Sequence, residues 1–261
     1  MAEGLKMITS RDGIATVHMT NGENRFRLSL VNAWMKILDE IEKNSGVKGV
    51  IITGNEKYFS LGLDVAYLST QTAEYLEETR ISTAKLYKRV TQLPVPTVAA
   101  INGHCFGAGS FLALACDYRV MRSDRGWLCW PEVALNMRIP PYNIYLLRLK
   151  FPVGKAIRDA VILGKRLTAR DSHALQLMDI VSSQESLNDD ATKLLHDVLG
   201  KNGIDRQSLK QMKADIYDFP SFFCVAVNAD LRRSCYIISK WPAISISVFI
   251  LLKQMKNRFQ T

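Results

Sequence analysis

An α/β fold is predicted for this chain of 261 residues from three features of its sequence. Short, β-prone apolar runs alternate with helical stretches along most of the chain. Two of these runs, residues 47–53 and 98–101, lead through glycine-containing turns directly into a helix start. From residue 153 to residue 216 helical segments predominate. Strands alternating with helices in this way favour a sheet that is covered by helices.

Outside the two strand–turn–helix units, the expected elements follow from apolar periodicity and helix caps. In chain order they are strands over residues 5–9 and 14–19, a helix over 29–44, a helix over 153–163, a helix starting at the Thr168 cap, a strand over 179–181, and helices over 189–199 and 206–216.

The most informative segment, residues 93–117, reads as a strand, a turn and a helix start in immediate succession. Gly107 and Gly109 let the backbone bend tightly before an apolar helix over residues 110–116. The first amides of a helix have no partner within it, and the helix dipole adds to their positive potential. They are therefore suited to holding an oxyanion, although such a turn is more often a packing feature.

A similar connection lies upstream, where the strand over residues 47–53 is followed by the sequence Phe59-Ser60-Leu61-Gly62-Leu63-Asp64. The helix-like residues 65–68 come next. In the purely structural interpretation, Asp64 caps this short helix. Two strand–glycine–helix connections in one chain strengthen the case for a binding site.

Together with Trp130-Pro131-Glu132-Val133, these segments resemble the enoyl-CoA hydratase/isomerase (crotonase) superfamily over roughly residues 5–215. Each motif alone is loose, but their order and spacing are specific. The resemblance implies a crotonase-like spiral of β-β-α units over residues 1–200 and a C-terminal helical region over 201–261. In this family the C-terminal helices build trimers.

The resemblance also implies a site. In the family two backbone amides hold the thioester oxygen of the substrate, and carried onto this sequence they belong to Leu63 and Ala108. The expected substrate-binding residues around them are Lys57, Phe59, Ser60, Gly62, Asp64, Gly107 and Phe111. Lys57 is expected to contact coenzyme A, and residues 138–142 fall where the family lines its acyl pocket.

The side chains select among the reactions of the family. Hydratases place two glutamates at the site, but here the first position aligns with Phe111 and only the second is retained, as Glu132. One carboxylate is enough to remove a proton from C2 and return it to C4. If Glu132 is desolvated among Trp127, Trp130 and Val133, its pKa is expected to rise. The structural alternative is an exposed carboxylate at a strand end.

The resemblance is therefore closest to monofunctional Δ3,Δ2-enoyl-CoA isomerases, which convert 3-enoyl-CoA to 2-trans-enoyl-CoA during β-oxidation. No metal or redox cofactor is expected, because coenzyme A is part of the substrate. Two alternatives stay open. One is another enolate reaction on an acyl-CoA, such as hydration or thioester hydrolysis, and the other is a catalytically silent acyl-CoA-binding or scaffold protein.

Composition narrows the remaining possibilities. The formal charge of +9 is scattered along the chain, which fits an anionic ligand such as coenzyme A, and no nucleic-acid-binding pattern is present. Five widely spaced cysteines indicate an intracellular, reducing compartment. The resemblance suggests the peroxisome, with the cytoplasm or mitochondrion as alternatives.

The C-terminal stretch departs from the family pattern. Residues 235–252 are unusually apolar, but Lys240 and Pro242 interrupt them. The remaining run, residues 241–252, is shorter than the roughly 20 residues that a spanning helix needs. We expect a tail that packs on the core or at a homo-oligomer interface, with membrane contact as the alternative.

Overall fold

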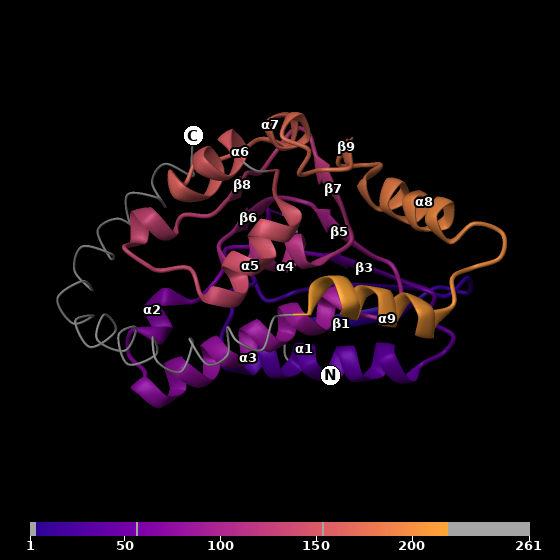
Figure 1. Ribbon diagram of the computed structural model, residues 1–261, viewed down its shortest axis with the longest axis horizontal. Helices are drawn as coiled ribbons and strands as arrows, with labels where there is room; N and C mark the ends of the chain where they lie inside the picture. Colours follow the sequence, from indigo (N-terminus) through magenta and orange to yellow (C-terminus); the bar gives the residue numbers. More distant parts are fainter. Residues whose placement is uncertain (1–3, 56, 153, 219–261) are drawn as a thin grey trace.

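The computed structural model describes residues 4–55, 57–152 and 154–218 (Figure 1). Its strands are β1 (Leu5–Thr9), β2 (Ile14–Met19), β3 (Gly49–Thr53), β4 (Tyr58–Ser60), β5 (Thr97–Ile101), β6 (His104–Phe106), β7 (Tyr118–Arg122), β8 (Leu128–Cys129) and β9 (Ile180–Ser182). Its α-helices are α1 (Leu28–Lys43), α2 (Val65–Leu68), α3 (Ala73–Thr91), α4 (Ala108–Ala115), α5 (Pro141–Lys150), α6 (Lys155–Ile157), α7 (Ala169–Ala174), α8 (Leu187–Leu199) and α9 (Arg206–Tyr217). A 3₁₀ turn, η1 (Glu132–Leu135), and a π turn, η2 (Arg158–Ile162), complete the described elements.

Two sheets organise these elements. The larger sheet has six strands in the order β1-β2-β3-β5-β7-β9, and the smaller has three in the order β4-β6-β8. Only β1 and β2 pair antiparallel, and the other strand pairs in both sheets are parallel. The successive strand pairs β3/β4, β5/β6 and β7/β8 each give one strand to each sheet. The predicted spiral of β-β-α units is thereby confirmed.

The central strands β3 and β5 of the large sheet are buried on both faces. Ile51, Val98 and Val120 belong to a cluster that packs against α8. Val50 and Ala99 point the other way and belong to the main core, which includes α1 and α4. Alternate residues of a strand face opposite sides, so fully apolar strands such as β3 and β5 fit a sheet covered twice. Figure 1 shows α8 on the opposite side of the strands from α1 and α3.

Most expected elements are present with boundaries that match or are shifted by one or two residues. The caps are also as expected: Thr168 forms a capping box with Asp171 at the start of α7, and Asp64 accepts a hydrogen bond from the Tyr67 amide at the start of α2. Two boundaries differ in a way that matters. The glycine-turn helix begins at Ala108 rather than at residue 110, because Gly107 turns the chain with φ of 50°.

The helix expected over residues 153–163 is shorter and less regular. A single α turn, α6, passes into the π turn η2, where the Leu163 amide donates to the carbonyl oxygen of Arg158, five residues earlier. Val153 lies outside the described residues.

The long helix α3 was not predicted from the sequence. Its buried positions include Thr79, Thr83, Tyr87 and Val90, which follow helical spacing. Two of these four are threonines, and they hide the apolar periodicity on which helix prediction depends. The local signal that was available is the cap, because the Thr72 side chain accepts a hydrogen bond from the Tyr75 amide.

The described part of the C-terminal region packs on the core. Lys213 of α9 is only 6% exposed, and its Nζ lies 2.6 Å from Oδ2 of Asp117 just beyond α4. The predicted division at residue 200 stays a prediction, and the apolar tail lies outside the described residues. None of the helices in residues 4–218 that the structure describes combines the length and apolar character that crossing a bilayer requires.

Two turns approach each other closely at the ends of β4 and β6 of the smaller sheet. A Cβ atom added to Gly109 would lie 2.6 Å from the Ser60 Cβ and 2.8 Å from the Ser60 carbonyl oxygen. A Cβ atom on Gly62 would lie 2.7 Å from the Phe106 carbonyl oxygen. Residues with larger side chains would force these turns apart.

Gly109→Ala should therefore destabilise the fold by about 1–3 kcal/mol, the usual cost of overpacking, although alanine is the better helix former. Urea unfolding measures this change. Gly46→Ala is the matched control, because its added Cβ would meet only the Asn44 side-chain oxygen, at 3.1 Å. Equal stability of the parent and Gly109→Ala would contradict this packing.

Candidate active site

One cavity of about 170 Å³ lies where α2, α3, α4, η1 and α5 meet. It is lined mainly by apolar side chains, with a few polar groups among them. The lining residues are Leu63, Leu68, Leu76, Thr79, Arg80, Thr83, Ala84, Tyr87, Ala108, Phe111, Glu132, Asn136, Met137, Arg138, Pro140 and Asn143. A largely apolar cavity with few polar groups is typical of a ligand site.

Leu63 brings a backbone amide to this cavity. The carbonyl oxygen of Gly62, in the same peptide group, accepts a hydrogen bond from the Phe26 amide at 2.8 Å. The N–H and C=O of a trans peptide point in opposite directions, so the Leu63 amide points away from Phe26. Within the described ranges, no carbonyl or side chain accepts a hydrogen bond from it.

Ala108 brings a second amide. The Gly107 carbonyl oxygen accepts a hydrogen bond from the Phe111 amide at 3.0 Å inside α4, so the Ala108 N–H points out of the helix start. No acceptor for this amide occurs among the described residues either. A Cβ atom on Gly62 would lie 3.0 Å from the Ala108 nitrogen, so the two turns that carry the amides are in contact.

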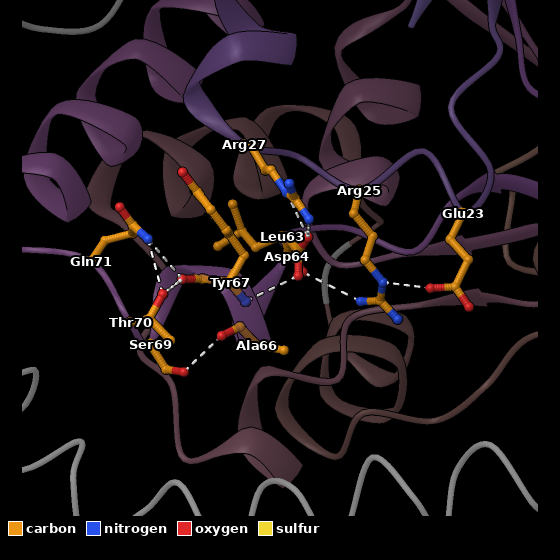
Figure 2. A network of polar contacts seen from close by, with 10 residues as sticks. All are labelled: Glu23, Arg25, Arg27, Leu63, Asp64, Ala66, Tyr67, Ser69, Thr70 and Gln71. Atoms are coloured by element: carbon orange, nitrogen blue, oxygen red, sulfur yellow. Dashed lines mark hydrogen bonds and ion pairs between the residues drawn. The ribbon is translucent and has the colours of Figure 1, made fainter.

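A polar network holds the Leu63 turn in place (Figure 2). Arg27 forms an ion pair with Asp64 at 2.7 Å and stacks over the Tyr67 ring at 4.2 Å. Arg25 is paired with Glu23 and reaches the Leu63 carbonyl oxygen at 3.5 Å. The Arg25 contact and the Asp64 amide, which donates to the Phe26 carbonyl oxygen at 3.0 Å, orient the peptide group that follows Leu63.

Glu132 supplies the carboxylate of the cavity. It is the first residue of η1, and its Oε2 is buried without a hydrogen-bond partner among the described residues. A Cβ atom on Gly107 would lie 3.7 Å from its Oε1, so the carboxyl lies beside the turn that carries the Ala108 amide. Burial raises the pKa of Glu132 from 4.5 to about 7.

The predicted rise in the pKa of Glu132 is confirmed, but its expected surroundings are partly wrong. Val133 is 53% exposed, and Trp127 packs against His104 with 5.0 Å between ring centres. Neither Val133 nor Trp127 lines the cavity. Tyr87, Ala108 and Phe111 line it with Glu132 instead. The alternative of an exposed strand-end carboxylate is also wrong, because a one-turn 3₁₀ helix directs the carboxyl inward.

Phe111 occupies the position where the resemblance places a second glutamate in hydratases. It is 1% exposed, and its ring packs between Tyr87 and Trp130 with centroid distances of 6.1 and 6.3 Å. Among the residues that line the cavity, Glu132 is the only carboxylate.

Tyr87 is a site residue that the sequence did not reveal. Its hydroxyl donates to the Ala108 carbonyl oxygen at 2.9 Å, which anchors the first turn of α4. Burial and the nearby Glu132 charge hold the pKa of Tyr87 well above its usual value. The residue escaped prediction because it lies on α3, the helix whose periodicity is hidden.

The other expected substrate contacts separate into two groups. Gly62 and Gly107 shape the two turns, each with positive φ. Lys57, Phe59, Ser60 and Asp64 do not line the cavity. Phe59 and Ser60 are buried, and the Ser60 hydroxyl accepts a hydrogen bond from the Gly62 amide at 3.1 Å, which supports the turn. Lys57 is exposed, and its contact with coenzyme A stays a prediction.

Cys105 lies near the site in sequence but is not suited to attack a substrate. It is fully buried, and burial raises the pKa of its thiol far above the usual range. Burial also lowers the pKa of the neighbouring His104 to about 4.

Glu132→Gln should stabilise the protein above pH 7, because a buried carboxylate is costly to ionise and glutamine preserves its shape. The native state holds its proton more tightly than the unfolded state. The gain should therefore reach up to about 3 kcal/mol at alkaline pH and disappear below pH 4.5. Chemical unfolding as a function of pH, with the exposed Glu40→Gln as control, measures it. A difference that does not vary with pH would contradict this burial.

Comparisons with known proteins show the family of the chain. The model of the enoyl-CoA hydratase/isomerase family matches residues 9–219. Peroxisomal enoyl-CoA delta isomerase 2 of Arabidopsis thaliana is 33% identical over 165 residues, which cover 61% of this chain and 69% of the relative.

Solved structures agree on the fold. Human mitochondrial delta3-delta2-enoyl-CoA isomerase matches with a TM-score of 0.86 at 23% identity, covering 98% of this chain and 99% of that chain. An enoyl-CoA hydratase of Bacillus anthracis matches with a TM-score of 0.72 at 22% identity, covering 98% and 97%. At such identities the likeness concerns the fold alone, but with the family match it leads to one conclusion. The chain belongs to the enoyl-CoA hydratase/isomerase family.

Proposed function

We propose that this protein is a Δ3,Δ2-enoyl-CoA isomerase in which Glu132 is the single acid/base. The observation that carries the proposal is the composition of the cavity. One buried carboxylate lies beside the turn that carries a free amide, and Phe111 fills the neighbouring wall with an apolar ring. Such a site offers one proton carrier and two hydrogen-bond donors.

The first step is removal of a proton from C2 of a 3-enoyl thioester by the Glu132 carboxylate. The electron pair of the broken C–H bond forms a C1=C2 double bond, and the thioester carbonyl becomes an enolate oxygen. Leu63 and Ala108 donate their amide hydrogens to that oxygen. One donor of this kind is typically worth about 3 kcal/mol of transition-state stabilisation.

The second step returns the proton from Glu132 to C4. The C3=C4 pair takes up the proton, the C2=C3 bond forms, and the thioester carbonyl is restored. Nothing is oxidised or reduced in the overall reaction, so a redox cofactor is not required. A carboxyl with a pKa of about 7 suits both steps, because near neutral pH it can both accept the proton from C2 and give it up to C4.

Hydration is the less favoured reaction. Addition of water needs one group that activates the water and another that manages the proton at C2. Phe111 carries no ionisable group, and the Tyr87 hydroxyl is already engaged with the Ala108 carbonyl oxygen. A catalytically silent acyl-CoA-binding or scaffold protein remains the alternative from another class, and it is distinguished by binding without turnover.

The proposal extends to the role and assembly of the protein. The named relative from Arabidopsis thaliana is peroxisomal, which supports a peroxisomal role in the breakdown of unsaturated fatty acids.

Met212 and Ile216 of α9 are 62% and 56% exposed. Exposed apolar side chains on a C-terminal helix favour packing against further copies of the chain, and a trimer is the assembly we propose.

Glu132→Gln should lower turnover of a medium-chain trans-3-enoyl-CoA by about 100-fold or more, because it removes the positioned base. Appearance of the conjugated 2-enoyl thioester measures turnover, and product analysis separates it from a 3-hydroxyacyl or hydrolysed product. For the parent, kcat/KM should rise with pH around an apparent pKa of about 7, because the ionised carboxylate is the base.

Glu185→Gln is the control, since Glu185 is an exposed glutamate outside the cavity. Turnover that survives in Glu132→Gln would refute the assignment of the base. Tight acyl-CoA binding without turnover in the parent would favour the scaffold alternative.

Ala108→Pro should be severe, because proline has no amide hydrogen to donate to the enolate. The expected loss in kcat is about 100-fold or more. Proline is favoured at the first position of a helix, so α4 should still form, as thermal unfolding would verify. Ala108→Gly keeps the amide and should retain most of the activity. A folded proline variant with parental kcat would rule out this donor.

A further inference from the structure

Asn143 is a polar side chain of the cavity that the proposed reaction does not use. It lies in the first turn of α5 and is 6% exposed. Its Oδ1 is buried, and among the described residues it has no hydrogen-bond partner. Buried polar groups in native proteins nearly always have partners, so an amide left without one beside a cavity points to a ligand.

The other polar residues of the cavity are accounted for. The Thr79 and Thr83 hydroxyls donate to carbonyl oxygens within α3, at 2.8 and 2.7 Å. Arg80 is paired with Glu77. Asn136 and Arg138 are exposed, and Glu132 is the proposed acid/base. The amide of Asn143 is thus the remaining buried polar group available to the substrate.

We propose that Asn143 is a specificity residue that hydrogen-bonds a hydroxyl group on the acyl chain of the substrate. A hydroxyl both donates and accepts, so it complements the carboxamide whichever of Oδ1 and Nδ2 faces the cavity. A plain hydrocarbon chain would leave the amide desolvated and unpaired. The cavity therefore favours acyl-CoA thioesters that carry one hydroxyl group beyond the reacting carbons.

This selection follows from the cost of unpaired polar groups. A site with a buried partner for a substrate hydroxyl discriminates strongly against the analogue that lacks it, whereas an apolar pocket discriminates weakly. A structural role for Asn143 has the opposite signature. If its amide supported the fold, an apolar replacement would destabilise the protein. With no partner to lose, Asn143→Leu should unfold no more easily than the parent.

The inference rests on the proposed isomerase function, and the experiment separates the two. Medium-chain trans-3-enoyl-CoA thioesters with a single hydroxyl, moved stepwise along the carbons beyond the double bond, are compared with the unsubstituted thioester by kcat/KM. Saturated acyl-CoA thioesters with and without the same hydroxyl are compared by calorimetric binding. Parent, Asn143→Leu and Thr83→Val are tested. Thr83→Val is the control because its lost hydroxyl bonds within α3.

The parent should prefer the hydroxylated thioester about tenfold or more at one hydroxyl position. Asn143→Leu should lose that preference without a lower unfolding temperature, and Thr83→Val should keep it. A parent without preference at any position, or an Asn143→Leu variant that retains it, would overturn the inference. Preferential binding without isomerisation would reject only the proposed reaction, and isomerisation without preference would reject only the role of Asn143.

Discussion

The contact between two backbone turns is the constraint on which the site depends. The turn at Gly62 is in contact with the turn before α4, and Gly109 is in contact with Ser60. Neither glycine has room for a Cβ atom. The Gly62 carbonyl oxygen accepts a hydrogen bond from the Phe26 amide, and the Gly107 carbonyl oxygen accepts one from the Phe111 amide within α4. The amides of Leu63 and Ala108 are therefore directed away from those anchors before any ligand binds, which is the preorganisation that stabilises a developing oxyanion.

Burial of the Glu132 carboxyl raises its pKa but lowers the stability of the folded protein. Glu132 lies on a short 3₁₀ turn whose geometry turns the carboxyl inward, and the surrounding side chains deprive one of its oxygens of a partner. The same desolvation that opposes its ionisation brings its pKa near neutrality. Asn143 of α5, whose Oδ1 is also buried without a partner among the described residues, carries a similar cost. Unpartnered polar groups that destabilise a fold tend to mark functional sites.

The strands β1, β2, β3, β5 and β9 and the helix starts capped by Asp64 and Thr168 were predictable, because apolar runs and caps are local signals. The strands β4, β6, β7 and β8 were not predicted. The residues Leu63, Ala108, Phe111 and Glu132 were placed by motif order, and all four line one cavity. The part of the cavity that α3 lines was not predictable, because the buried threonines of α3 interrupt the apolar pattern of the helix. Tyr87 can be assigned to the cavity only once that helix is known. Nor could the sequence show that Val133 points outward, because a 3₁₀ turn of four residues leaves no periodicity to read.

The central claim is that one carboxylate carries the proton from C2 to C4. The most direct test converts a trans-3-enoyl-CoA with deuterium at both C2 positions in ordinary water, within a single turnover, and locates deuterium in the product by mass spectrometry. A single carrier in a buried site should deliver deuterium to C4 in a measurable share of the product molecules. If C4 receives only solvent hydrogen in every product molecule from the first turnover, a separate acid supplies it and the single-carboxylate account is wrong.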